Sequence, residues 1–384
     1  MLHTSYLEIS KSAYKKNIAF IRSEVGEGTE ISIVVKGNAY GHGIEEIIPL
    51  AEANGIRHFS TFSADEAARV HACSRKNATV MIMGMLQDED MELLIEKGIE
   101  FFVFEFDRLK STIEVARRLG KKARIHVEVE TGFKRTGFEW EDREALTEIL
   151  KNYGEHLELK GLCTHYAGAE SISNYVRVTQ QIKRFERFYT YFQEVGLSFD
   201  RYHSACSAAM LSYPSTIMDM VRVGIASYGF WPTQETYMYR FDSLPEDDKN
   251  PLKRLISWKS SVMSLKQVKM GEFIGYGSSY MAPRDMTIAL VPVGYSHGFA
   301  RTLSNQGKVL IGGKILSVVG TVTMNSISVD ITDAKGIKKG DEVVLIGRQR
   351  KNEITVASFG ESTQQVNYEL LTRLPMNIPR KIVP

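Results

Sequence analysis

Apolar residues change their spacing repeatedly along roughly the first 230 residues of the chain. Short runs rich in β-branched and aromatic residues predict strands, and apolar residues recurring every three or four positions predict amphipathic helices. The candidate strands are residues 31–35, 58–62, 79–84, 100–104, 124–130, 157–165, 198–203 and 219–225. The candidate helices are residues 43–54, 64–74, 89–97, 107–119, 142–153 and 174–195. Strands and helices in this alternation predict an α/β fold with a parallel sheet, and the number of strands favours a closed (β/α)8 TIM-type barrel over an open sheet.

The pattern changes near residue 232. A polar segment at 232–251, with several prolines, predicts a linker or long loop. Beyond it, apolar and polar residues alternate at period two between Gly, Asn and Asp, which predicts a mainly antiparallel β domain. The candidate strands are 258–268, 286–295, 308–322, 326–332 and 341–347. We therefore expect a barrel at residues 1–235 and a C-terminal β domain at residues 236–384, with an N-terminal helix at 10–25 that docks to the second domain.

Composition excludes several classes of protein. The 384 residues include 48 Lys and Arg against 46 Asp and Glu, so no clustered basic charge points to a nucleic-acid partner. No apolar run reaches the roughly 18 residues that a membrane span needs, and the charged N-terminal residues do not resemble a secretory signal. Three distant cysteines, Cys73, Cys163 and Cys206, form neither a disulfide framework nor a zinc pattern. We expect a cytoplasmic protein without a metal site.

Polar residues follow several of the predicted barrel strands. Lys36 follows residues 31–35 directly, His165 ends the run 157–165, and Arg222 lies in the last run. Arg135 and Ser207 follow two other runs closely. Each of them alone is also explained as a solvated loop charge or a core polar group. Because barrel enzymes place their chemistry at the carboxyl ends of the strands, the set predicts one shared mouth.

The segment around Lys36 is the most informative. It has the sequence VVKGNAYGHG at residues 34–43, with a lysine directly after a buried strand. Burial lowers the pKa of a lysine, which suits an amine that forms a Schiff base. The glycines of the segment would let the backbone approach a ligand closely. A turn followed by a helix, with a solvated lysine, is the alternative interpretation.

This segment and eight others resemble the alanine racemase family of pyridoxal-phosphate (PLP) enzymes, also called fold type III. They are TGFKRTG (131–137), THYA (164–167), SAAML (207–211), MVRVGIASYG (220–229), YGSSY (276–280), VPVGYSHG (291–298), VGTVTMN (319–325) and IPR (378–380). The resemblance covers both predicted domains. It implies an amino-acid racemase that interconverts L- and D-alanine, with two bases acting on opposite faces of the substrate.

The resemblance also implies which residues hold the cofactor. Lys36 would hold PLP covalently and act as one base, and Arg222 would face the pyridine nitrogen. His165 would lie beside the ring, linked to Arg222 and to the second base. The residues implied to hold the phosphate are Tyr40, Ser207, Gly224 and Ile225. An arginine at the ring nitrogen discourages protonation of the ring, so Arg222 argues against a decarboxylase or an aminotransferase, which usually place a carboxylate there.

The remaining implied roles concern the substrate. Tyr276 would be the second base, contributed by the other subunit of a homodimer. Arg135 and the backbone of Met324 would hold the substrate carboxylate, and Tyr295 would line the entrance. Glu128 stands where many family members carry a carbamylated lysine, and we expect its carboxylate to supply the same negative charge beside Arg135.

Other positions depart from the family pattern. Asn325 replaces an aspartate, Met376 replaces a tyrosine, Lys134 replaces a small residue and Gly37 replaces an alanine. These changes concern the substrate rim, so racemisation of another or a broader set of amino acids, such as serine or lysine, is the alternative function.

Three rival classes were weighed against this prediction. Residues 294–298 match the GxSxG pattern of serine hydrolases, but the pattern requires a strand, a sharp turn and a helix in a doubly wound sheet. A PLP-binding protein without turnover would resemble the barrel alone. A PLP decarboxylase of the same fold type would differ at Arg222 and would release carbon dioxide.

Overall fold

The chain forms two units in the computed structural model, which describes residues 3–241, 250–363 and 367–384. The barrel unit comprises Ser12–Lys36 and Ile47–Arg254. The β unit comprises Met1–Lys11, Gly37–Glu46 and Leu255–Pro384. This division differs from the predicted boundary between residues 235 and 236, because two segments from the N-terminal part of the chain make their contacts within the β unit.

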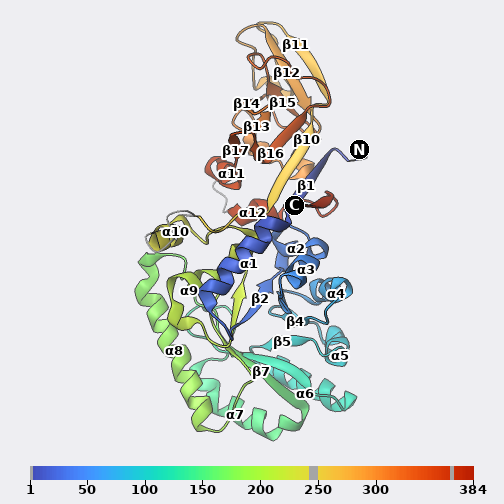
Figure 1. Ribbon diagram of the computed structural model, residues 1–384. Coiled ribbons are helices and arrows are strands. Elements are labelled where there is room, and N and C mark those ends of the chain that lie inside the picture. Colours follow the sequence, from blue (N-terminus) through green and yellow to red (C-terminus); the bar gives the residue numbers. More distant parts are fainter. Residues whose placement is uncertain (1–2, 242–249, 364–366) are drawn as a thin grey trace. The chain divides into compact units, whose positions relative to one another are not determined.

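The barrel unit contains one sheet of eight parallel strands, in the order β8-β7-β6-β5-β4-β3-β2-β9 (Figure 1). They are β2 (Glu30–Val34), β3 (His58–Thr61), β4 (Thr79–Ile82), β5 (Glu100–Val103), β6 (Ala123–Glu128), β7 (Leu157–Cys163), β8 (Tyr202–His203) and β9 (Met220–Val223). The two end strands meet through the amide of Arg222, which donates to the carbonyl of Ala205 at 2.9 Å, and the amide of Asp219, which donates to Tyr202 at 3.2 Å. The predicted α/β class with a TIM-type barrel is therefore confirmed.

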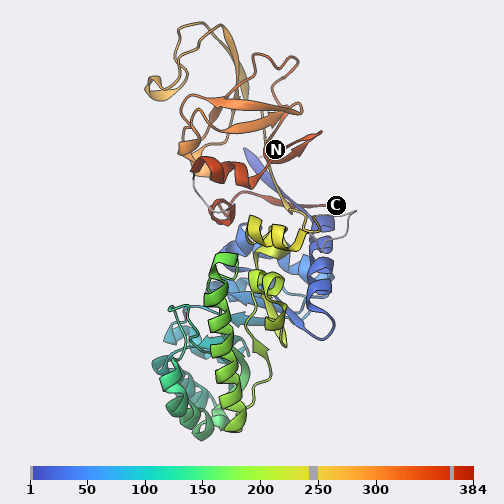
Figure 2. The same cartoon turned by 90° about the vertical axis from the view of Figure 1, so that its left-hand side faces the viewer.

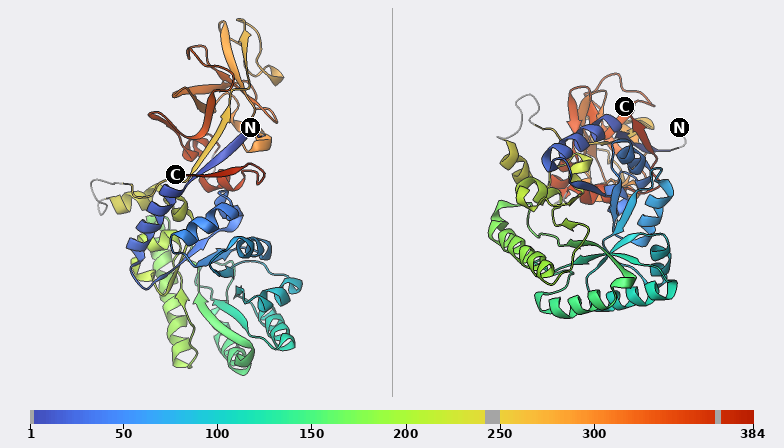
Figure 3. Two further views of the ribbon diagram at one scale, coloured as in Figure 1. Left: turned by 45° about the vertical axis from the view of Figure 1, so that its right-hand side comes forward. Right: turned by 60° about the horizontal axis from the view of Figure 1, so that its bottom comes forward.

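Helices connect these strands and lie outside them (Figures 1 and 3). They are α3 (Ile44–Ala53), α4 (Ala64–Cys73), α5 (Asp88–Glu96), α6 (Phe106–Leu119), α7 (Arg143–Asn152), α8 (Tyr175–Glu194) and α9 (Ser207–Ser212). The longest, α8, runs along the outside of the unit and buries Phe185, Phe188 and Phe192 (Figure 2). Every predicted barrel helix is present, because each has one apolar face that must be covered.

The N-terminal helix α1 (Lys11–Val25) is anchored within the barrel unit. The side chain of Asn17 donates to the carbonyl of Lys253 at 2.8 Å and accepts from the amide of Lys253 at 2.7 Å. The predicted docking of this helix to the second domain stays a prediction. Part of the predicted linker is helical, as α10 (Gln234–Phe241), while residues 242–249 lie outside the described residues.

The β unit contains a mainly antiparallel sheet in the order β11-β12-β15-β14-β13-β16-β10-β1-β18, with β17 paired to β16. Its strands are β1 (Ser5–Ser10), β10 (Ile256–Ser261), β11 (Ser264–Val268), β12 (Met286–Val291), β13 (Lys308–Ile311), β14 (Lys314–Val319), β15 (Ile327–Asp330), β16 (Glu342–Gln349), β17 (Asn352–Ile354) and β18 (Arg380–Val383). The predicted run 308–322 contains a hairpin, because Gly312 and Gly313, with φ of 62° and 81°, form its two-residue turn.

Sequence reasoning missed five elements of this unit, three strands and two helices. Strand β1 pairs with β10 in antiparallel and with β18 in parallel orientation, so the N-terminus belongs to the β unit. The strands β17 and β18 and the helices α11 (Val356–Thr363) and α12 (Asn367–Thr372) were also missed. Apart from β1, these elements are short, and a short element gives too few positions for a periodic pattern to show.

Candidate active site

Lys36 lies two residues after the end of strand β2. The amide of Val35 still donates to the carbonyl of Ser60 on β3, at 2.8 Å, so the sheet fixes the backbone up to the residue before the lysine. Residues 37–40 then form a left-handed turn, with φ between 51° and 62°. Only glycine adopts this conformation without a cost of about 1 kcal/mol or more per residue, and three of the four residues are not glycine. Such a strained turn must be held by surrounding contacts.

Those contacts come from the C-terminal part of the β unit. The guanidinium of Arg380 donates to the carbonyl of Gly41 through Nε at 3.0 Å and Nη2 at 2.9 Å. A Cβ added to Gly41 would meet the carbonyl oxygen of Leu371 at 1.9 Å. Tyr40 lies in this segment, with its ring edge-on to Tyr368 at 6.3 Å between centroids. Gly41 of the segment YGHG and Arg380 of the segment IPR therefore contact each other in the fold.

The amine of Lys36 lies among charged groups at the carboxyl end of the barrel strands. Its side chain is exposed at the mouth, yet desolvation around the amine, followed by the positive charge of Arg135, lowers the pKa of Lys36. Arg222 lowers this pKa as well, whereas Glu66 and Cys206 raise it. A lysine in this setting holds its proton less tightly than a solvated one, as Schiff-base chemistry requires.

Arg222 is 4% exposed, on β9, and most of its donors are already used. Nη1 donates to Nδ1 of His203 and, at 3.0 Å, to the carbonyl of His203. Nη2 donates to the carbonyl of Thr164 at 2.6 Å. Within the described residues the Nε hydrogen has no acceptor. The structure thus holds the guanidinium rigidly and leaves one donor for a ligand.

His165 lies near these cations without bonding to them. Its closest ring partner is Phe133, at 5.6 Å between centroids, and it makes no hydrogen bond to a described residue. Burial, with the positive charges of Arg222, Arg135 and Lys36, lowers the pKa of His165 to about 3, so its ring is neutral at pH 7. No hydrogen bond joins His165 to Arg222 among the described residues. The histidine that bonds to the guanidinium is His203, at Nη1.

Ser207, Gly224 and Ile225 form a group of polar atoms suited to a phosphate. The hydroxyl of Ser207, 5% exposed, accepts from the amide of Gly224 at 3.0 Å, so its own hydrogen is available to another acceptor. Ile225 begins a 3-10 turn (Ile225–Tyr228), and the first amide of such a turn has no carbonyl partner within it. Amides and a hydroxyl at the start of a helical turn favour an anion.

Arg135 presents a free guanidinium at the mouth. It stacks over the ring of Phe133, with Cζ 4.2 Å from the centroid, and makes no hydrogen bond or ion pair with a described residue. Glu128, 4% exposed at the end of β6, accepts from the hydroxyl of Thr136 at 2.7 Å. Burial raises the pKa of Glu128, although Thr136 and the charges of Arg135 and Arg222 oppose the rise. Glu128 therefore lies close enough to Arg135 to interact with it electrostatically, but it does not pair with it, and burial favours the neutral form of its carboxyl group.

The remaining candidates belong to the β unit. Tyr276, in the turn Tyr276–Ser278, is 74% exposed, and its phenol has no partner among the described residues. Tyr295 and Met324 lie together, since the amides of Tyr295 and Ser296 donate to the carbonyls of Thr323 and Met324, each at 3.0 Å. Of the departures from the family pattern, Asn325 follows Met324, with its Oδ1 2.8 Å from the Ser296 hydroxyl, and Met376 is 69% exposed.

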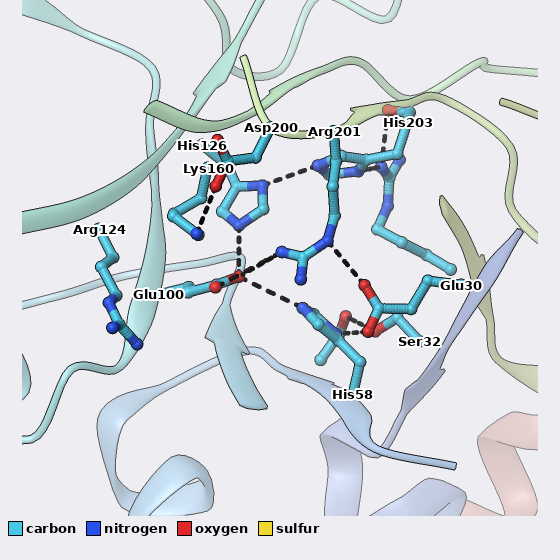
Figure 4. A network of polar contacts seen from close by, with 12 residues as sticks. Glu30, Ser32, His58, Glu100, Arg124, His126, Lys160, Asp200, Arg201 and His203 are labelled. Atoms are coloured by element: carbon cyan, nitrogen blue, oxygen red, sulfur yellow. Dashed lines mark hydrogen bonds and ion pairs between the residues drawn. The ribbon is translucent and has the colours of Figure 1, made fainter. Parts of the chain in front are cut away.

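A buried polar network behind Arg222 was missed by sequence reasoning. It includes His203, His126, Glu100 and His58 (Figure 4). Glu66 and Cys206, beside the amine of Lys36, were also missed. The available signal was the same for all of them, namely polar residues inside or just after apolar runs that the barrel buries. Only the fold shows which of these side chains point inward.

The GxSxG segment does not lie in the context of a serine hydrolase. It follows β12, which pairs in antiparallel orientation with β11 and β15, and it forms only the 3-10 turn Tyr295–His297. The strand, sharp turn and helix that the motif needs are not found at these residues. Among the described residues, no group of three or more His, Cys, Asp or Glu is placed to bind a metal ion.

A parallel barrel followed by an antiparallel domain, with a lysine and two arginines at the barrel mouth, defines a PLP-type fold with two domains. Family models named alanine racemase, N-terminal domain, and alanine racemase, C-terminal domain, match residues 9–232 and 255–382. The chain belongs to the alanine racemase family, and it is an isomerase of the amino-acid racemase type. The resemblance predicted from the motifs is confirmed.

Individual relatives agree over their full lengths. An alanine racemase of Desulforamulus reducens is 32% identical over 377 residues, which are 98% of this chain and 98% of that protein. The structure of an alanine racemase of Clostridium difficile superposes with a TM-score of 0.90, at 29% identity, covering 100% of this chain and 96% of that one. An alanine racemase of Bartonella henselae with covalently bound pyridoxal phosphate gives a TM-score of 0.83, at 26% identity, covering 99% and 100%. Among the described residues, we find no helix both long and apolar enough to cross a membrane.

Proposed function

We propose that this protein interconverts L- and D-alanine with PLP as its cofactor and with Lys36 and Tyr276 as the two groups that move the Cα proton. The observation that carries the proposal is the cluster at the barrel mouth. There Lys36 has a lowered pKa beside two arginines, and each arginine has a donor left for a ligand. The family's names support the substrate, and the Bartonella structure supports the covalent cofactor.

The residues present fit PLP. The unused Nε hydrogen of Arg222 matches a ring nitrogen, and the Ser207 hydroxyl and the amide of Ile225, beside Gly224, match a phosphate. Lys36 would hold the aldehyde carbon, Tyr40 would add a phosphate contact, and His165 would lie beside the ring as a neutral imidazole. When bound, the cofactor supplies a conjugated ring that accepts electron density from the Cα of the amino acid.

Arg222 limits how far that acceptance goes. Arg222 stays protonated, so it would donate to the ring nitrogen of the bound cofactor and would oppose protonation of that nitrogen. Removal of the Cα proton would then depend more strongly on well-placed bases of the protein. This favours racemisation over decarboxylation. An assay for carbon dioxide release distinguishes the two reactions.

Substrate positioning would come from the rim. Arg135 offers two parallel N–H donors to a carboxylate, and stacking on the Phe133 ring limits the orientations of the guanidinium. Glu128 would orient that guanidinium electrostatically, and the backbone of Met324 and the ring of Tyr295 would complete the rim. A Glu128→Ala variant whose KM for alanine is unchanged would argue against the role of Glu128.

The direct test is proton exchange. The protein, loaded with PLP, is given L-alanine in deuterated water, and we expect deuterium at Cα together with loss of optical rotation. L-Serine, L-lysine and L-glutamate are run in parallel, because Asn325 and Met376 make the rim different from the family pattern. Turnover of serine or lysine at rates equal to alanine would replace the proposal by the broader racemase, and no exchange with any of them would refute it.

We also propose a homodimer in which Tyr276 acts in the site of the partner subunit. Tyr276 is exposed together with Met270, Phe273 and Met281, which are 70%, 55% and 56% exposed. An apolar group of this kind around a base is a surface that a second subunit would cover.

Complementation tests the shared site. Lys36→Ala and Tyr276→Ala subunits, each inactive alone, are unfolded, mixed and refolded together. A shared site should restore about a quarter of the wild-type activity, because half of the randomly formed dimers carry one intact site out of two. No recovery would place both residues in the same chain.

A cytoplasmic location completes the proposal. Cys163 is a buried free thiol, and free thiols are typical of proteins in a reducing compartment. Fractionation of cells that express the protein would test it, and recovery from an oxidising compartment would contradict it.

A further inference from the structure

The interior of the barrel carries a continuous chain of buried polar groups that includes His203, His126 and Glu100 (Figure 4). Arg222 bonds to its first member, His203. Nε2 of His203 lies 2.8 Å from Nδ1 of His126, and Nε2 of His126 lies 2.8 Å from Oε2 of Glu100. His126 and His203 are fully buried, and Glu100 is 2% exposed. Because a barrel interior is usually filled by branched apolar residues, so many polar groups in one row need an explanation.

The direction of every bond in this chain follows from its first member. A guanidinium can only donate, so Nδ1 of His203 must accept from Arg222 and the proton of a neutral His203 sits on Nε2. That proton points at Nδ1 of His126, which must accept it, so the proton of His126 also sits on Nε2. The chain ends at Glu100, whose carboxylate can only accept.

The charge states agree with this direction. Burial would raise the pKa of Glu100, but hydrogen bonds from His126 and His58 outweigh it and hold the pKa well below its ordinary value. Burial lowers the pKa of His126 to about 4 and the pKa of His203 well below its ordinary value. At pH 7 the row is thus a cation, two neutral imidazoles and an anion.

Glu100 is itself fixed from its other side. His58 donates to Oε2 through Nε2 at 3.3 Å, and its Nδ1 lies 2.8 Å from the hydroxyl of Ser32. Arg201 lies 3.4 Å from Oε2 and pairs with Glu30 at 2.7 Å. The carboxylate therefore cannot turn away from His126 without losing several partners at once.

We propose that Glu100 is a positioning residue for Arg222: through His126 and His203 it fixes the tautomer that presents a lone pair to the guanidinium, so that Nε of Arg222 stays aimed at the ligand. The inference rests on the proposed function for what that ligand is. If His203 carried its proton on Nδ1 instead, it would meet Arg222 donor to donor, and the guanidinium would have to rotate.

The first test is nitrogen NMR of the wild-type enzyme, loaded with PLP and labelled with 15N-histidine. Signals of His126 and His203 are assigned from His126→Gln and His203→Gln variants. The proposal requires a proton on Nε2 and a bare Nδ1 in both rings. A proton on Nδ1 of His203 would overturn it, and this result does not depend on which reaction the enzyme performs.

The second test compares two variants of equal burial. Glu100→Gln keeps an acceptor for His126 but removes the charge, and the weaker bond should lower kcat about three- to tenfold while leaving KM for alanine unchanged. His58→Gln is the matched control, because His58 bonds to the same carboxylate but lies off the route to Arg222. It should lower the melting temperature as much as Glu100→Gln and leave kcat within about twofold. Equal losses of kcat in both variants, or no loss in Glu100→Gln, would overturn the proposal.

A third measurement asks whether Glu100 acts through Arg222. In an Arg222→Lys background the forked donor is already lost, so adding Glu100→Gln should change the affinity for PLP and the absorbance of the bound cofactor by less than about twofold. An undiminished effect in that background would assign Glu100 to folding alone. If the wild type binds PLP but racemises nothing, the proposed function fails, while the affinity and tautomer measurements still judge this inference.

Discussion

The barrel unit and the β unit hold their candidate residues in opposite ways. In the barrel unit, Glu128 at the end of β6 and Arg222 on β9 are each 4% exposed. In the β unit, Tyr276 and Met324 are 74% and 54% exposed and lie on loops. Groups packed together in a poorly solvated site shift one another's charge, whereas exposed groups do so only after another surface covers them. The barrel unit therefore sets its own electrostatics, and the β unit presents residues whose environment depends on a further partner.

Loss of the barrel amine should have the largest effect. Lys36→Ala removes both the attachment point for PLP and one proton carrier, so kcat for alanine should fall by about 10³-fold or more. Absorbance of the dialysed protein should show less retained cofactor. Lys183→Ala, at an exposed lysine on α8, is the control and should retain full activity. Activity in Lys36→Ala close to wild type would remove the barrel mouth from the chemistry.

The exposed base of the β unit is the second target. Tyr276→Phe deletes only the phenol oxygen, and kcat in both directions should fall about 10²-fold or more, because one of the two proton carriers is gone. The melting temperature should not change, since the phenol has no partner among the described residues. A variant with full activity would show that the β unit supplies no base.

Binding of the substrate carboxylate should depend on the shape of the guanidinium. Arg135→Lys keeps the charge but loses the two parallel donors and the stacking on Phe133, so KM for alanine should rise about tenfold with a smaller change in kcat. Lys134→Ala, next to it and paired with Glu139, is the control. Equal KM values for Arg135→Lys and wild type would exclude this contact.

Packing of the strained turn can be tested by stability alone. Gly41→Ala would bring a Cβ to 1.9 Å from the Leu371 carbonyl, so the free energy of unfolding should fall by about 3 kcal/mol or more. Gly336→Ala is matched, because its φ of 86° is similar but nothing lies within 4 Å of the added Cβ. That variant should lose only about 1 kcal/mol. Similar losses in urea unfolding would mean that the close approach is not what the turn requires.

Acid should lower the free energy of unfolding through the buried groups of the barrel interior. His126 has a pKa of about 4 in the folded protein against an ordinary 6.5, so the unfolded chain binds the proton first as pH falls. The unfolding free energy should therefore decrease between pH 6.5 and about 4, by about 2 kcal/mol at pH 5 for this one residue. The carboxylate of Glu100 adds a loss of the same sign at lower pH, because its folded pKa is lowered as well. In His126→Gln the decrease between pH 7.5 and 5 should be smaller, and an equal decrease would assign it elsewhere.

The long elements and the mouth residues could be predicted from the sequence, since they depend on local pattern. The eight barrel strands show as apolar runs, and Lys36, Arg222 and Ser207 stand at or just after such runs. Their assignment to a cofactor came from the resemblance to a family, not from periodicity. The strand β1 could not be predicted in the β unit, because its partners β10 and β18 are more than 240 residues away in the chain.

The chain of buried polar groups inside the barrel shows a second limit of prediction from the sequence. Glu100 and His126 stand in runs that the sequence marks only as apolar, and no spacing relates two residues on different strands. Their contacts with each other and with His203 depend on the register of the strands β5 to β8. That register places the side chains of Glu100, His126 and His203 inside the barrel. Register is a property of the closed sheet, so the buried row became visible only with the fold.

Covalent attachment at Lys36 is the most direct test of the account. The protein loaded with PLP is treated with borohydride, digested, and its peptides are weighed by mass spectrometry. We predict a phosphopyridoxyl group on the peptide that contains Lys36 and on no other lysine. A protein that carries no such group, or carries it elsewhere, would contradict the assignment of the barrel mouth as the active site.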